Sequence, residues 1–281
     1  MSLRPARENT GIEFVRTDAP GVRVRACAES VSDTTLSTSL GRDGVQVATV
    51  EHLMSALWGI GIDNLRVELT SEEVPIMDGS AAPFIDLINT VGVIEQNAAK
   101  QFIRIKRDVN VTQGDAVAKL SPYNGFKASY SFVADHPVYN SHPKTADLDF
   151  ADVSYVDAVS RARSFGLMKE LEQAQAINKC LGSSLQNAVG IDDHTVVNEG
   201  GLRYQDEFVK HKLLDVIGDL YLLGRPILGA FHGYKSGHAL NNKLARALMR
   251  CEDAWELVTF EGTAKRAERQ PILQPAAVSV S

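Results

Sequence analysis

Two different spacings of hydrophobic residues alternate along this chain, and each predicts one kind of element. In residues 65–69 every second residue is apolar, which is the period of a strand with one buried face. In residues 208–223 apolar side chains cover most of the circumference of a helix, so we expect that helix to be largely buried. Similar patterns predict helices in 49–61 and 239–250, and another after Ser80.

Residues that commonly cap helices mark several of the expected helix ends. We expect Thr49 to be the N-cap of the first helix and Gly59 to end it. Ser80 is expected to cap the second helix, with Pro83 in its first turn. Residues 102–135 instead alternate apolar and polar positions between glycine breaks, which predicts a half-buried antiparallel meander.

The order of these elements predicts the fold class. A helix–strand–helix order in the first part of the chain returns near the C-terminus without obvious residue identity, which predicts an α+β protein with two domains of similar plan. We place the domains at 1–97 and 98–261, and expect an insert in the second at about 160–190. Residues 262–281 are rich in Ala, Pro and Gln and are expected to form a frayed tail.

Composition limits the classes of protein and partner. The 281 residues carry a formal net charge of −6, which argues against a general binder of nucleic acid or of anionic membranes. The three cysteines are widely spaced, so neither a disulfide framework nor a cysteine-rich zinc module is indicated. No apolar run reaches the roughly 18 residues of a transmembrane helix, and the first residues contain no signal-peptide core. We therefore expect a cytoplasmic protein without a transmembrane segment, and a monomer.

The buried helix at 208–223 carries ionisable side chains that a purely structural helix would lack. His211, Asp215 and Asp219 are spaced four residues apart, so they lie along one helical face. A buried imidazole beside a buried carboxylate is costly unless a metal ion or a tight hydrogen bond satisfies both. The spacing alone leaves both explanations open.

Two further groups could complete such a site. Glu51 and His52 are adjacent on the first helix and point about 100° apart, so one could bind a metal while the other reaches a water. An exposed Glu beside a helix-start His is the alternative. His238 follows Gly237 at the start of a helix, where the helix dipole disfavours its cation unless a carboxylate such as Asp219 is close. A surface capping histidine is the alternative there.

These residue types match the chemistry of zinc hydrolases. Two His and one Asp are enough for a catalytic zinc and leave a fourth position for water. A neighbouring Glu could then accept the proton of that water as a general base.

Several long segments of the chain, in the same order, closely resemble one enzyme family. The segments are VEHLMSALWGIGIDNLRVEL, EVPIMDGSAAPF, SRARSFG, DEFVKHKLLDVIGDLYLLG and YKSGHALNN. Over about residues 3–260 the chain resembles the UDP-3-O-acyl-N-acetylglucosamine deacetylases, which are zinc amidases of lipid A biosynthesis. The resemblance implies hydrolysis of an acetamide to a free amine and acetate. It also implies two β-α-α-β sandwiches that face each other, each with one insert.

The same resemblance implies roles for individual residues. The implied zinc ligands are His52, His211 and Asp215, and the implied catalytic residues are Glu51 as general base, His238 as a positively charged histidine, Asp219 as its support, and Ser164. Ser164 stands where family members commonly have Thr, and it keeps the hydroxyl that could hydrogen-bond an oxyanion. Iron(II) could replace zinc, because two His and one Asp accept either metal.

Substrate contacts follow from the resemblance as well. Lys212 and Lys235 would face the diphosphate and sugar of a UDP-sugar, and Phe165 would contact the nucleotide sugar. The acyl chain of the substrate would occupy a tunnel formed by the insert at about 168–189. The small and apolar residues that suit an alkyl chain there are Ala174, Ile177, Cys180, Leu181 and Gly182.

One departure from the family pattern concerns the start of the chain. The first residues, LRPA, fall well inside that pattern, so the opening hairpin of the family, with its glycine-rich His-containing turn, is not found. We expect that a missing strand would leave a sheet edge unpaired and would lower stability or turnover relative to a full-length homologue.

Two other functions compete with this interpretation. A zinc amidohydrolase of another sugar amide or small amide would share the metal site, but it would turn over an unacylated substrate equally well. A catalytically inactive ligand-binding remnant would agree with a missing N-terminal segment, although all the proposed catalytic residues are present.

Overall fold

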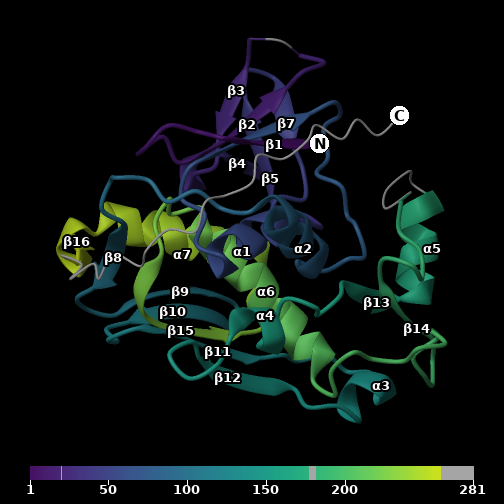
Figure 1. Cartoon of the computed structure of the whole chain (residues 1–281). Helices are drawn as coiled ribbons and strands as arrows, with labels where there is room; N and C mark the ends of the chain where they lie inside the picture. Colours follow the sequence, from purple (N-terminus) through teal and green to yellow (C-terminus); the bar gives the residue numbers. More distant parts are fainter. Residues whose placement is uncertain (20, 177–181, 261–281) are drawn as a thin grey trace.

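The structure is a computed structural model that describes residues 1–19, 21–176 and 182–260. It combines helices with several β-sheets, so the predicted α+β class is confirmed. Figure 1 shows a layer of helices between a sheet from the N-terminal half and a larger sheet from the C-terminal half. The helices of this layer are α1 (Glu51–Gly59), α2 (Ala82–Val91), α6 (Glu207–Tyr221) and α7 (His238–Arg250).

The N-terminal half contains a four-stranded sheet in the order β1-β7-β2-β3. Its strands are β1 (Ser2–Pro5), β2 (Ile12–Arg16), β3 (Arg23–Arg25) and β7 (Leu65–Leu69). Strands β2 and β7 pair in parallel, so the chain between them must cross over, and this crossover contains α1. The same crossover carries a short 3-10 helix, Ala28–Ser30, and a three-stranded antiparallel sheet of β4 (Val31–Asp33), β5 (Ser39–Arg42) and β6 (Val45–Val47).

The C-terminal half contains the larger sheet, whose order is β12-β11-β15-β10-β9, with β8 paired to β15 and β16 paired to β8. Its strands are β8 (Gln101–Ile105), β9 (Val109–Gln113), β10 (Ala116–Ser121), β11 (Phe126–Ser131), β12 (Thr145–Asp149), β15 (Ile227–Tyr234) and β16 (Trp255–Thr259). The predicted antiparallel meander is therefore wrong in part. Strands β9 and β10 do pair in that way, but β15, which comes about a hundred residues later, lies between β10 and β11 and pairs with both.

Short elements lie between β11 and α6, and the insert expected at about 160–190 stays a prediction. They are α3 (Pro137–Asn140), α4 (Tyr155–Ala158), β13 (Phe165–Leu167), α5 (Met168–Ala176) and β14 (Val189–Ile191). Elsewhere, a short 3-10 helix, Glu252–Ala254, precedes β16. Strands β13 and β14 pair in parallel and carry α5 away from the main body (Figure 1). The predicted tail at 262–281 lies outside the described residues.

The contact between α1 and α6 determines where the polar side chains of both helices meet. A Cβ added to Gly218 of α6 would lie 2.0 Å from the carbonyl oxygen of Glu51, so only glycine allows this approach. The predicted buried helix is confirmed, because residues from Glu207 to Tyr221 are almost all buried. None of the helices in the described part of the chain is long and apolar enough to span a membrane.

Two details of the expected helix ends turn out differently. Thr49 is not the N-cap of α1: that position belongs to Val50, and the Thr49 hydroxyl donates to Glu73 instead. Thr49 has a φ of 58°, which is outside the extended region that an N-cap residue usually adopts. Ser80 is likewise not the N-cap of α2, because that position belongs to Ala81, although the Ser80 hydroxyl accepts a hydrogen bond of 3.3 Å from the amide of Ala82. The domain boundary at 97/98 stays a prediction.

Candidate metal and acid–base site

Helix α6 brings three ionisable side chains into the interior. His211 and Asp215 are each 4% exposed and Asp219 is 2% exposed, and all three project from the face that the four-residue spacing predicts. Such groups are costly to bury without partners, so their neighbours indicate what the site can do.

His52 of α1 completes a cluster with two of them. The possible ligand atoms of His52, His211 and Asp215 all lie within 4.8 Å of one another. Nε2 of His211 is 3.4 Å from Oδ1 of Asp215, and Nε2 of His52 is 3.6 Å from the same oxygen. Two imidazoles and one carboxylate are a common donor set for a divalent metal with one position left open. The predicted ligands are therefore brought together.

The hydrogen bonds of the two imidazoles also agree with metal binding. Nδ1 of His211 is 3.1 Å from the carbonyl oxygen of Ala162 and donates to it, which leaves Nε2 with its lone pair toward the cluster. Burial lowers the pKa of His211 to about 4, so the ring is neutral, as a ligand must be. Nδ1 of His52 is buried and has no hydrogen-bond partner among the described residues, so protein contacts alone leave this ring incompletely satisfied.

The carboxylate of Asp215 is kept ionised by its neighbours. Burial alone would raise its pKa, but the ammonium group of Lys212 holds the pKa well below the usual range. Nζ of Lys212 donates to Oδ2 at 2.8 Å, while Oδ1 faces the two histidines. One oxygen of Asp215 therefore remains directed at the candidate ligand atoms of the two histidines.

Glu51 lies at the first turn of α1, beside this cluster, and is 3% exposed. Its Oε2 accepts a hydrogen bond of 3.0 Å from the amide of Thr38, and its Oε1 is 3.9 Å from Nε2 of His238. Burial raises the pKa of Glu51, although the neighbouring His238 opposes the rise. A carboxylate with a raised pKa is a stronger base, which suits it to accept a proton.

His238 begins α7 after the N-cap Gly237, as predicted, and its side chain is 13% exposed and forms an ion pair, so it is not a surface capping residue. Nδ1 of His238 donates to Oδ2 of Asp219 at 3.0 Å. Burial alone would lower the pKa of His238, but Asp219 and Glu51 raise it to about 10. The imidazole is therefore a cation at neutral pH, with Nε2–H facing Glu51.

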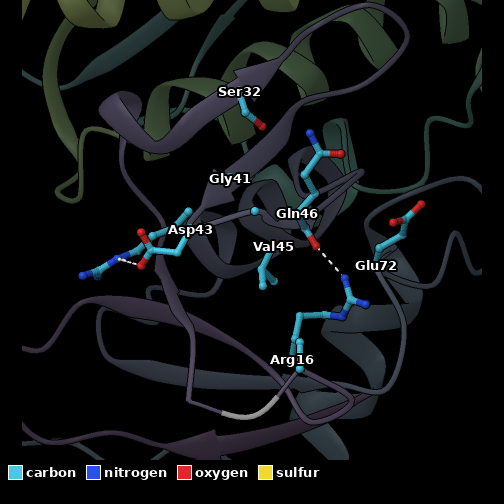
Figure 2. Close-up of a pocket in the computed structure, with 10 residues that line it drawn as sticks. Arg16, Ser32, Gly41, Asp43, Val45, Gln46 and Glu72 are labelled. Carbon is cyan, nitrogen blue, oxygen red and sulfur yellow. Dashed lines mark hydrogen bonds and ion pairs between the residues drawn. The ribbon is translucent and has the colours of Figure 1, made fainter.

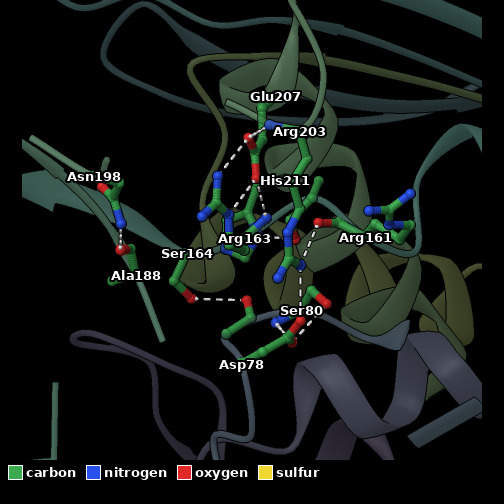
Figure 3. Close-up of polar contacts among 12 residues, drawn as sticks. Asp78, Ser80, Arg161, Arg163, Ser164, Ala188, Asn198, Arg203, Glu207 and His211 are labelled. Carbon is green, nitrogen blue, oxygen red and sulfur yellow. Dashed lines mark hydrogen bonds and ion pairs between the residues drawn. The ribbon is translucent and has the colours of Figure 1, made fainter. Parts of the chain in front are cut away.

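Ser164 and Phe165 directly follow Arg163, whose buried ion pair with Glu207 anchors their segment. Glu207 accepts hydrogen bonds from the backbone and guanidinium of Arg163 and from the backbone of Arg203 (Figure 3). The amide of Ser164 donates to the carbonyl of Gly79 at 2.8 Å, and its hydroxyl reaches the same oxygen at 3.3 Å. The hydrogen bonds to Glu207 thus fix the segment that also supplies the Ala162 carbonyl for His211.

The predicted substrate-binding residues do not all lie together. Nζ of Lys212 lies 5.7 Å from the ring centre of Phe165, and this ring contacts that of His211, so these residues adjoin the metal cluster. Lys235 instead lies in the turn before α7, exposed and paired with Asp115. Of the residues expected to line an acyl tunnel, Ile177, Cys180 and Leu181 lie outside the described residues, as does the side chain of Ala174, while Gly182 is exposed.

Sequence reasoning missed two residues of the site. Thr38 contacts both Glu51 and Asp219, and Nδ2 of Asn241 donates to Oδ2 of Asp219 at 2.8 Å. Asn241 could have been found, because it lies three residues after His238 and so on the same helical face. Thr38 belongs to a run of Ser and Thr residues with no periodicity, and nothing in the sequence marks it out.

A separate hollow of about 540 Å³ lies in the N-terminal half (Figure 2). Its two arginines already have partners: Arg16 donates to the carbonyl of Gln46 and pairs with Asp18, and Arg42 pairs with Asp43. None of the candidate catalytic or metal-binding residues lines it, so we assign it no part in the site.

Comparisons with known proteins identify the family. A family model described as UDP-3-O-acyl N-acetylglycosamine deacetylase matches residues 1–250. A relative of the same description from Chromohalobacter salexigens is 59% identical over 268 residues, which cover 95% of this chain and 88% of the relative. A relative from Marinobacter nauticus is 56% identical over 276 residues, or 97% of this chain and 91% of the relative, and one from Coxiella burnetii is 53% identical over 262 residues, or 93% and 86%. The family model and these relatives all match most of the chain, and we conclude that it belongs to the UDP-3-O-acyl-N-acetylglucosamine deacetylase family.

Proposed function

We propose that this chain is a zinc-dependent deacetylase that hydrolyses the acetamide of UDP-3-O-acyl-N-acetylglucosamine to the free amine and acetate, a step of lipid A biosynthesis. The observation that carries this proposal is one arrangement: the donor set of His52, His211 and Asp215 lies beside the buried carboxylate of Glu51 and the partly buried imidazolium of His238. Family membership supplies the substrate class. We further propose that the protein acts as a cytoplasmic monomer.

His52, His211 and Asp215 would hold the metal. The neutral state of His211 and the ionised state of Asp215 are those that ligands require. Zinc bound there would supply a Lewis acid that polarises the acetamide carbonyl and lowers the pKa of water to about 7. Iron(II) would suit the same three residues.

Glu51 would act as the general base. The amide of Thr38 holds Oε2, so Oε1 is the oxygen left to accept a proton from water. Burial raises the pKa of Glu51 and so increases its basicity. General base catalysis of this kind contributes about 10²- to 10⁴-fold to a rate.

His238 would stabilise the negative charge that develops on the acetamide oxygen, because its cation is held in place by Asp219. The Ser164 hydroxyl would turn from the carbonyl of Gly79 to the same oxygen. The leaving amine then needs one proton, which either His238 or the newly protonated Glu51 would donate.

Lys212 and Phe165 would bind the nucleotide sugar next to the cluster, and Lys235 would approach the diphosphate after leaving Asp115. The segment at about 168–189 would surround the acyl chain. A substrate without an acyl chain should therefore react more slowly.

The test is acetate release from the UDP-3-O-acylated sugar by purified protein, with and without a chelator. We expect Glu51→Gln to lower kcat by about 10²- to 10⁴-fold while the bound metal is retained, because the substitution removes the base and no ligand. Glu29→Gln, the same change at an exposed glutamate of the same half, is the control and should leave kcat unchanged.

Two results would contradict the proposal. Full activity after complete removal of the metal would exclude the metal-dependent mechanism. Equal kcat/KM for acylated and unacylated sugar would instead favour an amidohydrolase of broader substrate range.

A further inference from the structure

Thr38 uses all three of its polar groups at the candidate site, although it is neither a metal ligand nor an acid or base. It lies directly before β5 and is 1% exposed. Its hydroxyl donates to Oδ1 of Asp219 at 2.6 Å, and its amide donates to Oε2 of Glu51 at 3.0 Å. Its carbonyl accepts a hydrogen bond of 3.1 Å from the amide of Val50, the N-cap residue of α1.

These hydrogen bonds connect elements that are far apart in the sequence. Glu51 belongs to α1 of the N-terminal half, whereas Asp219 belongs to α6 of the C-terminal half. Thr38 comes from the segment between β4 and β5, so it bridges two helices from a third element. Both hydrogen bonds end on carboxylates, and hydrogen bonds to charged groups contribute more than neutral ones.

The bridge restricts the Asp219 carboxylate. Thr38 occupies Oδ1, while Nδ1 of His238 and Nδ2 of Asn241 donate to Oδ2. With both oxygens engaged, the carboxylate plane cannot rotate freely, and the imidazole that it orients keeps Nε2 3.9 Å from Oε1 of Glu51.

We propose that Thr38 is a positioning residue that fixes the orientation of Glu51 and His238 relative to each other. Its amide binds Glu51 directly, and its hydroxyl binds Asp219, which in turn orients His238. The part of this inference that concerns the effect of Thr38 on turnover rests on the proposed function. The effect of Thr38 on the geometry of His238 does not depend on the substrate.

The kinetic test compares variants of one side chain. Thr38→Val fills nearly the same volume and keeps both backbone hydrogen bonds, so it removes only the bond to Asp219. We expect kcat to fall by about 10- to 100-fold with KM and bound metal unchanged, because the lost bond orients a group that acts in the transition state. Thr38→Ala should show the same loss if the valine variant folds poorly, and Thr38→Ser should restore most of the activity.

Thr35→Val is the matched control. It makes the same substitution in the same segment, but the Thr35 hydroxyl donates to the exposed Asp33 rather than to the site. Its kcat should equal that of the parent.

A second measurement separates this inference from the proposed function. In the ¹⁵N-labelled protein without substrate, the ring signals of His238, assigned with His238→Gln, should shift in Thr38→Val and remain in place in Thr35→Val. Unchanged His238 signals in Thr38→Val would overturn the inference even if the parent releases no acetate. A kcat of Thr38→Val equal to the parent, or a loss confined to KM, would overturn it in an active enzyme.

Discussion

A single partly buried residue, His238, illustrates how neighbours decide the charge of a side chain. Desolvation alone would lower its pKa, as it does for any histidine withdrawn from water. Asp219 at 3.0 Å and Glu51 at 3.9 Å reverse that tendency. Asp215 adds a third negative charge from the same face of α6.

The raised pKa of His238 predicts how stability depends on pH. Its ordinary pKa is 6.5 and its pKa in the folded protein is about 10, so the folded state binds the proton more tightly. The stabilisation is therefore fully present below pH 6.5 and is lost as the pH rises through about 10. In urea unfolding of metal-free protein, the difference in free energy between the parent and His238→Gln should shrink from about pH 6 to about pH 10. A difference that grew with pH would contradict the ion pair.

At the scale of elements, the crossing of α1 and α6 assembles the site. The backbone of α1 at Glu51 packs directly on α6 at Gly218, one helical turn after Asp215. This approach places His52 of α1 within 3.6 Å of the Asp215 carboxylate. A side chain at 218 would separate the helices, and with them the candidate ligands His52 and Asp215.

Gly218→Ala is expected to destabilise the protein although alanine is the better helix former. Helix propensity alone favours alanine by about 1 kcal/mol, whereas overpacking a core contact costs about 1 to 3 kcal/mol. We expect a net loss in the free energy of unfolding, measured in urea, together with weaker metal binding. Gly200→Ala is the control, because an added Cβ there meets no atom within 4 Å and the backbone has no positive φ. A variant as stable as the parent would show that the helices can separate at little cost.

At the scale of the whole molecule, one hydrophobic cluster joins the two halves. It contains buried residues of the N-terminal sheet and α1, such as Phe14 and Leu57, and of the C-terminal sheet and α6, such as Phe231 and Leu214. The candidate site lies at this junction, since α1 supplies Glu51 and the candidate ligand His52, and α6 of the C-terminal half supplies the candidate ligands His211 and Asp215. A metal ion bound by His52, His211 and Asp215 together should therefore stabilise the contact between the two halves.

Metal binding is accordingly expected to raise the melting temperature. A ligand that binds only the folded state adds about 2.7 kcal/mol at a free concentration of about 100 times its Kd. Added zinc should raise the Tm of chelator-treated protein by several degrees, and His52→Ala should lose most of that increase. An equal increase in both proteins would place the zinc elsewhere.

Local pattern was enough to predict much of this protein. The helix at 208–223 and its buried polar face follow from the spacing of residues that are near in sequence, and side chains four residues apart on a helix must lie together. The same reasoning placed Gly237 before a helix that begins at His238. The pairing of His52 with His211 and Asp215 came instead from resemblance to a family, because no local rule connects residues 159 positions apart.

Only the tertiary structure decided the contacts between distant segments. Strand β15 lies between β10 and β11, which a meander of neighbouring strands could not predict, because strand pairing depends on which edges meet during packing. Thr38 reaches Glu51 and Asp219 for the same kind of reason: its hydroxyl has no preferred partner in the sequence until α1 and α6 cross beside it. Periodicity determines which face of an element is buried, whereas packing of distant elements determines what that face meets.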